Sequence, residues 1–337
     1  MFGDLDAIAE AIRHLPDRDE SAASEAADRQ AQLTKPAGSL GRLEELAIWL
    51  AAWQGKEKPS LDKIVTLVFA GNHAVASRGV SAFPSDVTVQ MVANFEHGGA
   101  AINQLCRLAG SELIVIPLKL DRPAADFTLG PSLNESEFLK TVNAGFEAVP
   151  EDADVVCIGE MGIGNTTAAA AVAYGLYEGA AEDWVGRGTG VDDAGLQRKI
   201  DVLNAGYDAN RDLLHSSLGA LRAFGGRELA AMFGAALACR MKRVPLVVDG
   251  YVSTAAVAPL HAMNPHGLEH ALFAHRSAEQ AHQHLVARLG QAPLLDLGMR
   301  LGEASGAAIA ALILRAAVET HNGMATFAEA GVSDSET

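Results

Sequence analysis

Short apolar runs and segments with helical spacing alternate along the middle of the chain. Runs rich in β-forming residues occur at 64–69, 113–116, 155–158, 244–248 and 271–274, and amphipathic patterns separate them. This alternation is typical of βαβ units, in which helices cover both faces of a parallel sheet. The pattern therefore predicts an α/β fold of three layers, α/β/α, around a mostly parallel, Rossmann-like sheet.

Both ends of the chain have a helical pattern instead. Residues 4–57 show apolar positions at helical spacing, and the loop at 34–41 interrupts them. Residues 302–328 are mostly helical, and 304–318 are almost wholly apolar. A helix that is apolar on every side must be covered, so we expect it to lie inside the subunit or at a dimer contact.

Composition narrows the functional classes. The 337 residues are enough for one large domain or two smaller ones, and no apolar run is long enough to span a bilayer. The first residues lack the pattern of a signal peptide, which predicts a cytoplasmic protein. Three widely spaced cysteines disfavour a disulfide framework or structural zinc. A net charge of −16 argues against a nucleic-acid partner.

A glycine-rich motif follows the predicted strand at 155–158. It reads Glu160-Met-Gly-Ile-Gly-Asn-Thr-Thr167 and leads into an alanine-rich segment. Glycine lets the backbone approach a phosphate, and the free N–H groups of a first helical turn point toward such an anion. The motif thus predicts an anion site beside the Glu160 carboxylate, formed by Gly162, Gly164, Asn165, Thr166 and Thr167. An ordinary strand-to-helix turn with a capped helix is the alternative.

A second glycine-rich loop comes shortly afterwards and contains Gly186, Gly188, Thr189 and Gly190. Lys199 follows it, at the edge of an apolar helical stripe. A lysine in that position commonly covers apolar surface and keeps its ammonium group in water. If the two glycine loops meet at one phosphate, however, a lysine head is expected there.

Glu303 lies in a glycine-punctuated turn just before the apolar C-terminal segment. A glutamate at a helix N-terminus is often only a capping residue. Apolar surroundings would raise its pKa and suit it to act as a general base. The sequence leaves both roles open.

The stretch 81–91 reads as an apolar loop with isolated polar groups. It could hold a flat aromatic ring through Ser81, Phe83, Pro84, Gln90 and Met91, or it could simply cover the sheet. The eleven histidines suggest a metal, but their spacings match no common zinc motif, so we expect no metal ligands.

Together these segments resemble the nicotinate-nucleotide–dimethylbenzimidazole phosphoribosyltransferases, which make the lower nucleotide of cobalamin. Matching segments occur in the family's order between Leu33 and Val332: 33–41, 79–84, 90–91, 98–102, 159–167, 185–193, Lys199, 249–250, 277–279, 294–306 and 322–327. The chain departs from the family's usual residues at Ala37, Asn72 and Ala74. These departures leave Glu160, Lys199 and Glu303 intact.

The resemblance implies transfer of a 5-phosphoribosyl group from nicotinate mononucleotide to dimethylbenzimidazole, with inversion at the anomeric carbon. It implies Glu303 as general base, Glu160 in the active site, and the glycine loops with Lys199 around the phosphate. It implies no metal or redox cofactor. It also implies an α/β catalytic domain (60–292), a small helical domain from both chain ends (1–59 and 293–337) that carries Glu303, and a homodimer.

Two other functions remain open at this point. The same site could pass the ribosyl group to water, which would require a wet or absent ring pocket. Alternatively, the chain could bind nucleotides without catalysis, although the presence of both Glu303 and Glu160 argues weakly against this.

Overall fold

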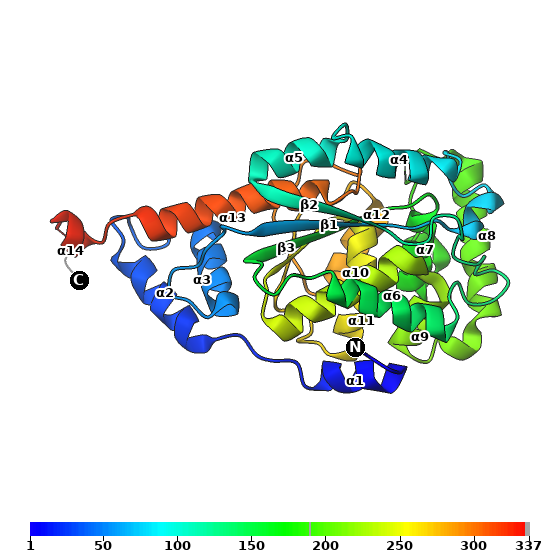
Figure 1. The fold of residues 1–337 in the computed structure, drawn as a ribbon, viewed down its shortest axis with the longest axis horizontal. Coiled ribbons are helices and arrows are strands. Elements are labelled where there is room, and N and C mark those ends of the chain that lie inside the picture. The colour runs from blue at the N-terminus through cyan, green and yellow to red at the C-terminus, as the bar shows by residue number, and fades with distance from the viewer. Residues whose placement is uncertain (189, 334–337) are drawn as a thin grey trace.

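Five parallel strands form a single sheet at the centre of the molecule (Figure 1). The computed structural model describes residues 1–188 and 190–333. The strand order is β2-β1-β3-β4-β5, with β1 (Ile64–Ala70), β2 (Ser111–Pro117), β3 (Val155–Met161), β4 (Leu246–Val248) and β5 (Ala271–Phe273). These strands confirm the predicted α/β class and the five predicted β segments.

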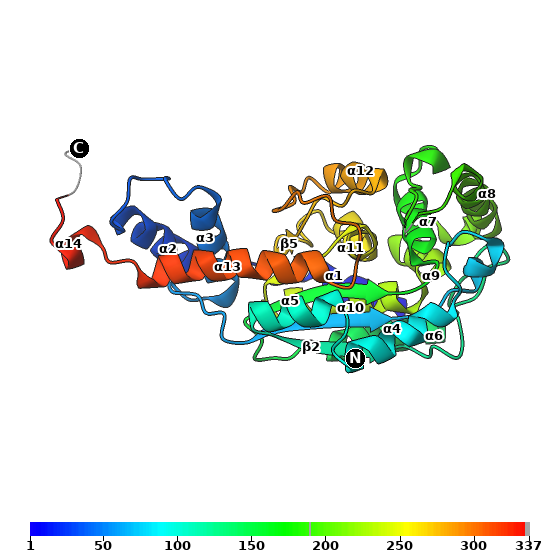
Figure 2. The same ribbon diagram turned by 90° about the horizontal axis from the view of Figure 1, so that it is seen from above.

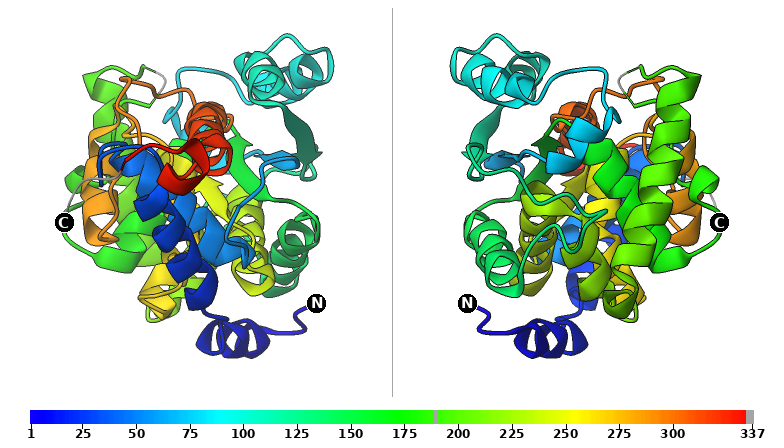
Figure 3. Two further views of the ribbon diagram at one scale, coloured as in Figure 1. Left: turned by 90° about the vertical axis from the view of Figure 1, so that its left-hand side faces the viewer. Right: turned by 90° about the vertical axis from the view of Figure 1, so that its right-hand side faces the viewer.

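Helices cover both faces of this sheet, as the end-on views in Figure 3 show. One face packs against α6 (Glu135–Glu147), α7 (Asn165–Tyr177), α9 (Ser217–Phe224), α10 (Gly226–Lys242) and α11 (Tyr251–Met263). The other face packs against α3 (Arg42–Gln54), α4 (Asp86–Glu96), α5 (Ala101–Ala109) and α13 (Ser305–Gly323). Because both faces are covered, β1 is apolar at nearly every position and buried along its whole length.

The apolar C-terminal segment is α13, and its burial is explained within one chain. Its first turn lies directly on β3, because a Cβ added to Gly159 would overlap the backbone of Ala304. Ala307, Ala311 and Leu314 belong to the core between the sheet, α3 and α5. Figures 1 and 2 both show α13 running from the sheet to the end of the molecule where α2 (Glu20–Gln32) and α14 (Phe327–Ala330) lie.

The remaining N-terminal helix, α1 (Leu5–Arg13), packs away from α2 and α3. Its Ile8 and Ile12 are buried in the core that contains α11. Both α1 and the first half of α13 therefore contact the α/β layers, while α2 and the far end of α13 do not reach the sheet in Figure 1. The division into 60–292 and a domain of both ends stays a prediction.

The prediction of a loop at 81–91 is wrong for the second half of this stretch. Helix α4 begins at Asp86, and it buries Thr88, Val92 and Phe95 at helical spacing. Of the apolar residues that suggested a ring-binding loop, Phe83 and Pro84 precede this helix, and Met91 lies within it. Among the helices of the described residues, none is long and apolar enough to cross a membrane.

The other elements complete the connections around the site. They are α8 (Asp193–Ala209), α12 (Gln280–Arg288) and the short 3₁₀ helices η1 (Ala74–Arg78), η2 (Ala181–Asp183) and η3 (Arg211–Leu213). Helix α8 follows the second glycine-rich loop, as the sequence pattern predicts. Helix α12 follows β5, and its N-cap residue, Glu279, lies at the carboxyl-end edge of the sheet.

Candidate active site

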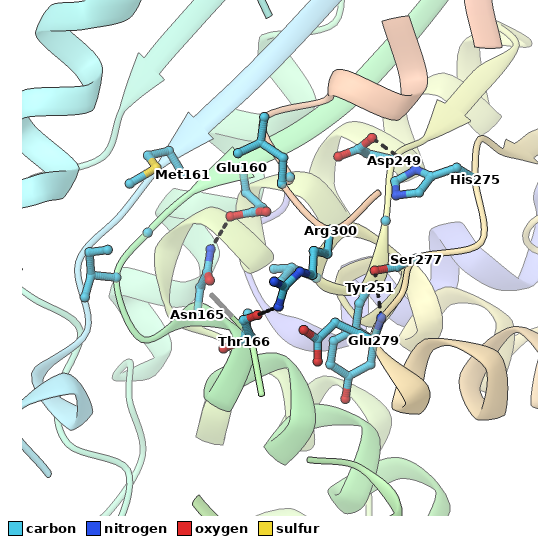
Figure 4. Close-up of a pocket in the computed structure, with 17 residues that line it drawn as sticks. Glu160, Met161, Asn165, Thr166, Asp249, Tyr251, His275, Ser277, Glu279 and Arg300 are labelled. Atoms are coloured by element: carbon cyan, nitrogen blue, oxygen red, sulfur yellow. Dashed lines mark hydrogen bonds and ion pairs between the residues drawn. The ribbon is translucent and has the colours of Figure 1, made fainter. Parts of the chain in front are cut away.

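A cavity opens at the carboxyl ends of the central strands, where open parallel sheets bind their ligands (Figure 4). Its wall comes from β3 and the start of α7, from the segments that follow β4 and β5, and from the turn before α13. Its polar and charged lining residues include Glu160, Thr166, Asp249, His275, Glu279 and Arg300. Of the predicted residues, Gly162, Asn165 and Gly188 line it as well.

Glu160 stands at the end of β3 and is 7% exposed. Its Oε2 accepts a hydrogen bond from Nδ2 of Asn165, the first residue of α7. Burial, followed by the negative charges of Glu228 and Asp249, raises the pKa of Glu160 well above its usual range. This environment therefore favours the protonated form of the Glu160 carboxyl group.

The N-terminus of α7 is open toward this cavity. The residue before it, Gly164, has a φ of 96°, a left-handed conformation that glycine adopts without strain. No side chain caps the helix. The N–H groups of Asn165 and Thr167 donate to the carbonyls of Gly162 and Gly164, so in this turn of the described chain the N–H of Thr166 is the one left for an anion, together with the Thr166 side chain. This geometry favours the predicted anion site over a merely capped turn.

Lys199 connects the two glycine-rich loops. Its Nζ lies 3.2 Å from Oγ1 of Thr166 and donates a hydrogen bond of 3.0 Å to the carbonyl of Gly186. The side chain is 2% exposed, so the expectation of an ammonium group kept in water is wrong. Its position on α8 against the two loops buries the side chain, and this burial lowers the pKa of Lys199 to about 8.

Glu303 lies beside the cavity, directly after its lining residue Gly302. Its backbone N–H donates to the carbonyl of Glu160 over 3.2 Å, and its φ of 61° is unusual for a residue with a side chain. Only 5% of Glu303 is exposed, and burial raises its pKa to about 7. Such a carboxyl group is poised to exchange a proton near neutrality.

Asp249 is a third buried carboxyl group, at the end of β4. It is 1% exposed, and its Oδ1 accepts a 3.0 Å hydrogen bond from the N–H of Ala307 in the first turn of α13. Burial raises the pKa of Asp249 to about 7, although the backbone N–H groups of Ala307 and Gly306 oppose this shift. Asp249 therefore fixes α13 to the sheet beside Glu303.

Several cavity residues were not singled out from the sequence as site residues. They are Asp249, Tyr251, His275, Ser277, Glu279 and Arg300. The first five come shortly after β4 or β5, just as Glu160 ends β3. The rule that ligands bind at the carboxyl ends of parallel strands was thus a usable signal for them. Arg300 carried no such signal, because its loop reaches the cavity only through tertiary packing.

A buried histidine–glutamate pair lies behind the first glycine loop and was also missed. Nε2 of His73, after β1, contacts Oε1 of Glu228 in α10, and Glu228 is completely buried. A Cβ on Gly71 would overlap this carboxylate, so the pair packs directly against the backbone. Asn72 beside it donates from Nδ2 to the carbonyl of Leu120 over 3.0 Å, which is a structural role.

The remaining predicted residues lie outside the cavity wall. Gly164, Thr167, Gly186 and Gly190 do not line it, and the side chain of Thr167 is fully buried. None of the five proposed ring-binding residues, Ser81, Phe83, Pro84, Gln90 and Met91, lines it either, and Phe83 is 49% exposed. Thr189 falls outside the described residues.

The histidines lie in unrelated environments. In the part of the chain that the structure describes, no three His, Cys, Asp or Glu side chains are grouped closely enough to hold a metal ion. Of the pair spaced by four, His266 is exposed and bonded to Glu269, whereas His270 is buried and bonded to the carbonyl of Ala236. These two side chains thus do not share a site.

Comparison with known proteins gives one consistent result. A family model described as "Phosphoribosyltransferase" matches residues 15–332. Proteins named nicotinate-nucleotide–dimethylbenzimidazole phosphoribosyltransferase match from Mesorhizobium japonicum, at 57% identity over 99% of both chains, and from Ruegeria pomeroyi, at 54% identity over 98% of both chains.

A solved structure agrees with these relatives. The crystal structure of CobT from Thermus thermophilus superposes with a TM-score of 0.86 at 39% identity, covering 94% of this chain and all of that one. The sequence relatives and the similar solved structure therefore indicate the same family. The chain belongs to the nicotinate-nucleotide–dimethylbenzimidazole phosphoribosyltransferase family.

Proposed function

We propose that this enzyme transfers the 5-phosphoribosyl group of nicotinate mononucleotide to dimethylbenzimidazole, with inversion at the anomeric carbon. The products are nicotinate and α-ribazole 5′-phosphate, a precursor of cobalamin. One observation carries the proposal: a buried lysine and a free helix N-terminus meet beside carboxyl groups whose pKa values are raised. The lysine and the helix N-terminus suit a phosphate, and the carboxyl groups suit proton transfer at neutral pH.

The phosphate would bind where the two glycine-rich loops converge. Lys199 supplies a positive charge there, and the backbone N–H and the hydroxyl of Thr166 supply hydrogen-bond donors. Lys199 is 2% exposed, and electrostatic interactions are stronger in such a buried environment than in water. A bound phosphate would also satisfy Lys199 better than its present carbonyl and hydroxyl partners do.

A single general base is enough for the chemistry. The pyridinium nitrogen of the donor leaves as a neutral atom, so no acid has to protonate it. The acceptor must lose its N–H proton while its other nitrogen attacks the anomeric carbon. We assign that proton to Glu303, whose pKa of about 7 suits the task, and general-base catalysis of this kind typically contributes about 10²–10⁴-fold. No step requires a metal or redox cofactor.

Glu160 would have a different role, because Asn165 fixes its orientation and burial raises its pKa well above the usual range. As a neutral acid it can donate a hydrogen bond, and we propose that it orients the ribose or the attacking ring. Holding donor and acceptor in line can be worth about 7–11 kcal/mol. Orientation would therefore supply a large share of the rate.

The ring-binding surface is incomplete within one chain. Leu301, which lines the cavity beside Arg300, is 53% exposed, and Leu297 in the same loop is 59% exposed. Exposed apolar side chains beside a ligand cavity indicate a surface that another molecule covers. We propose a homodimer in which the second subunit covers this mouth and completes the pocket for dimethylbenzimidazole.

The decisive experiment compares nicotinate release from nicotinate mononucleotide with and without dimethylbenzimidazole. Transferase activity requires release that depends on the acceptor, together with formation of α-ribazole 5′-phosphate. Equal release without acceptor would identify a hydrolase. A Glu303→Ala variant that still binds the nucleotide but no longer transfers would support Glu303 as base, whereas unchanged turnover would remove it from that role.

Phosphate recognition has its own test. Lys199→Ala should raise the KM for nicotinate mononucleotide much more than the KM for dimethylbenzimidazole, because only the former carries a phosphate. Equal effects on both substrates would contradict the assignment.

A further inference from the structure

Glu279 is a cavity residue for which the proposed reaction has no task. It is 8% exposed, and in Figure 4 its carboxylate points into the cavity near Thr166 and Arg300. A Cβ on Gly186 would overlap Oε2 of Glu279, so the carboxylate lies directly against the second glycine-rich loop. The carbonyl of the same Gly186 accepts the hydrogen bond from Lys199. The carboxylate and the proposed phosphate-binding ammonium therefore flank one residue.

A buried network holds the Glu279 segment in place. The N–H of Glu279 donates to Oγ of Ser277 over 3.3 Å, and the N–H of Ser277 donates to Nδ1 of His282 over 2.9 Å. Since Nδ1 accepts, the ring proton is on Nε2, which lies 3.0 Å from Oγ1 of Thr254. That hydroxyl in turn donates to the carbonyl of Gly250 over 2.8 Å.

Burial keeps His282 in the neutral form that this network requires. His282 is fully buried, and burial lowers its pKa to about 3. It can therefore hold the Ser277 backbone in the same way across the physiological pH range. A carboxylate on a backbone segment that is fixed next to a ligand cavity is suited to recognise a specific group.

The chemistry of that group follows from what surrounds the carboxylate. Among the described residues no side chain donates a hydrogen bond to Glu279, although the carboxylate is an acceptor with several lone pairs. A phosphate would be repelled by it. In a nucleoside 5′-phosphate, the donors joined most closely to the phosphate are the 2′ and 3′ hydroxyls of the sugar.

We infer that Glu279 recognises the ribose by accepting hydrogen bonds from its 2′ and 3′ hydroxyls, so that the site selects ribonucleotides over deoxyribonucleotides. The inference rests on the proposed function, because it takes a nucleotide with its phosphate at Lys199 as the ligand. Leaving a buried carboxylate without its hydroxyl partner would disfavour the deoxy compound.

The test measures dissociation constants by titration calorimetry for nicotinate mononucleotide and for its 2′-deoxy and 3′-deoxy analogues. The wild-type protein should bind the ribonucleotide roughly 10- to 100-fold more tightly than either analogue, as expected for a hydrogen bond to a charged acceptor. In Glu279→Ala this preference should collapse to within about threefold. Glu279→Gln keeps the shape and one neutral acceptor, so it should retain an intermediate preference.

The matched control is Glu147→Gln, which removes the same charge from an exposed position on α6 and should leave all three constants unchanged. The preference ratio separates recognition from a structural role. If Glu279 only balances the charge of Lys199, its variants will change all three affinities by the same factor, and the inference is overturned.

The outcome also distinguishes this inference from the proposed function. A wild-type protein that binds all three nucleotides equally contradicts ribose recognition by Glu279 alone. A wild-type protein that binds none of them contradicts the proposed function and the inference together.

Discussion

At the scale of single residues, surroundings give identical carboxyl groups different chemistry. Glu303 and Glu160 are both glutamates, and burial raises the pKa of Glu303 to about 7. Burial, together with the charges of Glu228 and Asp249, also raises the pKa of Glu160 well above its usual range. The two environments thus differ in the charges that surround each carboxyl group.

The first prediction concerns the rate at low pH. Glu303 acts as a base only when ionised, so kcat/KM for dimethylbenzimidazole should rise with pH through about 7 and then level off. A Glu303→Gln variant should be slower by about 10²–10⁴-fold and should lack this rise. A pH–rate profile measures both. An unchanged rise in the variant would assign the ionisation to another group, such as Asp249.

The second prediction concerns the rate at high pH. Lys199 binds phosphate as an ammonium, so kcat/KM for the nucleotide should fall as pH rises through about 8, the pKa of Lys199 in the free enzyme. Lys199→Arg keeps its charge at every accessible pH and should move the fall beyond the measured range. A fall that stays at the same pH in the arginine variant would count against Lys199.

The third prediction is a stability cost of the same carboxyl group. The folded-state pKa of Glu303 is raised from 4.5 to about 7, so its proton stabilises the folded state at low pH. That contribution is complete below pH 4.5 and is lost as pH rises through about 7. Glu303→Gln should therefore increase the free energy of unfolding by roughly 3 kcal/mol at pH 8 relative to its effect at pH 4. Urea unfolding at the two pH values measures this difference, with Glu147→Gln as the exposed control.

At the scale of elements, the site is assembled from segment ends. Strands β3 and β4 each end in a buried carboxyl group, and α7 begins without a side-chain cap. A strand end is where the backbone leaves the sheet, and a helix start is where N–H groups lack partners, so both are available to a ligand. The regular parts of these strands and this helix hold their ends at fixed positions relative to one another.

The fourth prediction tests the start of α7. Gly164 has a φ of 96°, so Gly164→Ala should lower the free energy of unfolding by about 1–2 kcal/mol. It should also raise the KM for the nucleotide about tenfold or more, because the backbone N–H groups of the anion site would shift. Gly290→Ala is the matched control, since Gly290 also has a positive φ, 64°, and open space around it. It should cost similar stability and leave KM unchanged; equal changes in KM would contradict a role for the α7 terminus.

At the scale of the whole molecule, α13 couples distant parts of the chain. Its start is held by Asp249 on the sheet, and its last turn is held by α2, where Nε of Arg29 donates to the carbonyl of His321 over 2.9 Å. Glu303 immediately precedes this helix. The position of the proposed base thus depends on packing at both ends of the molecule.

The fifth prediction concerns assembly. If a second subunit covers the cavity mouth, the protein should sediment at twice the mass of one chain, and its specific activity should fall on dilution as dimers dissociate. Leu301→Asp should weaken the dimer and raise the KM for dimethylbenzimidazole more than that for the nucleotide. Sedimentation velocity across a concentration series and steady-state kinetics provide the two measurements. A fully active monomer would contradict the proposal that a second subunit covers the cavity mouth.

The sequence by itself determined the local parts. Apolar runs predicted all five strands, and the glycine-rich motif after β3 predicted a helix start with free N–H groups, because backbone conformation and periodic burial depend on residues close together in the chain. The ordered motifs also carried the family resemblance that the comparisons confirmed.

Only the tertiary structure decided which parts meet. It buried the head of Lys199 between two loops, made a helix of the second half of 81–91, and brought Asp249, Glu279 and Arg300 to one cavity. Burial and electrostatic environment arise from residues far apart in sequence, so no local pattern could supply them. The raised pKa of Glu303 is a property of this packing and not of the turn that contains it.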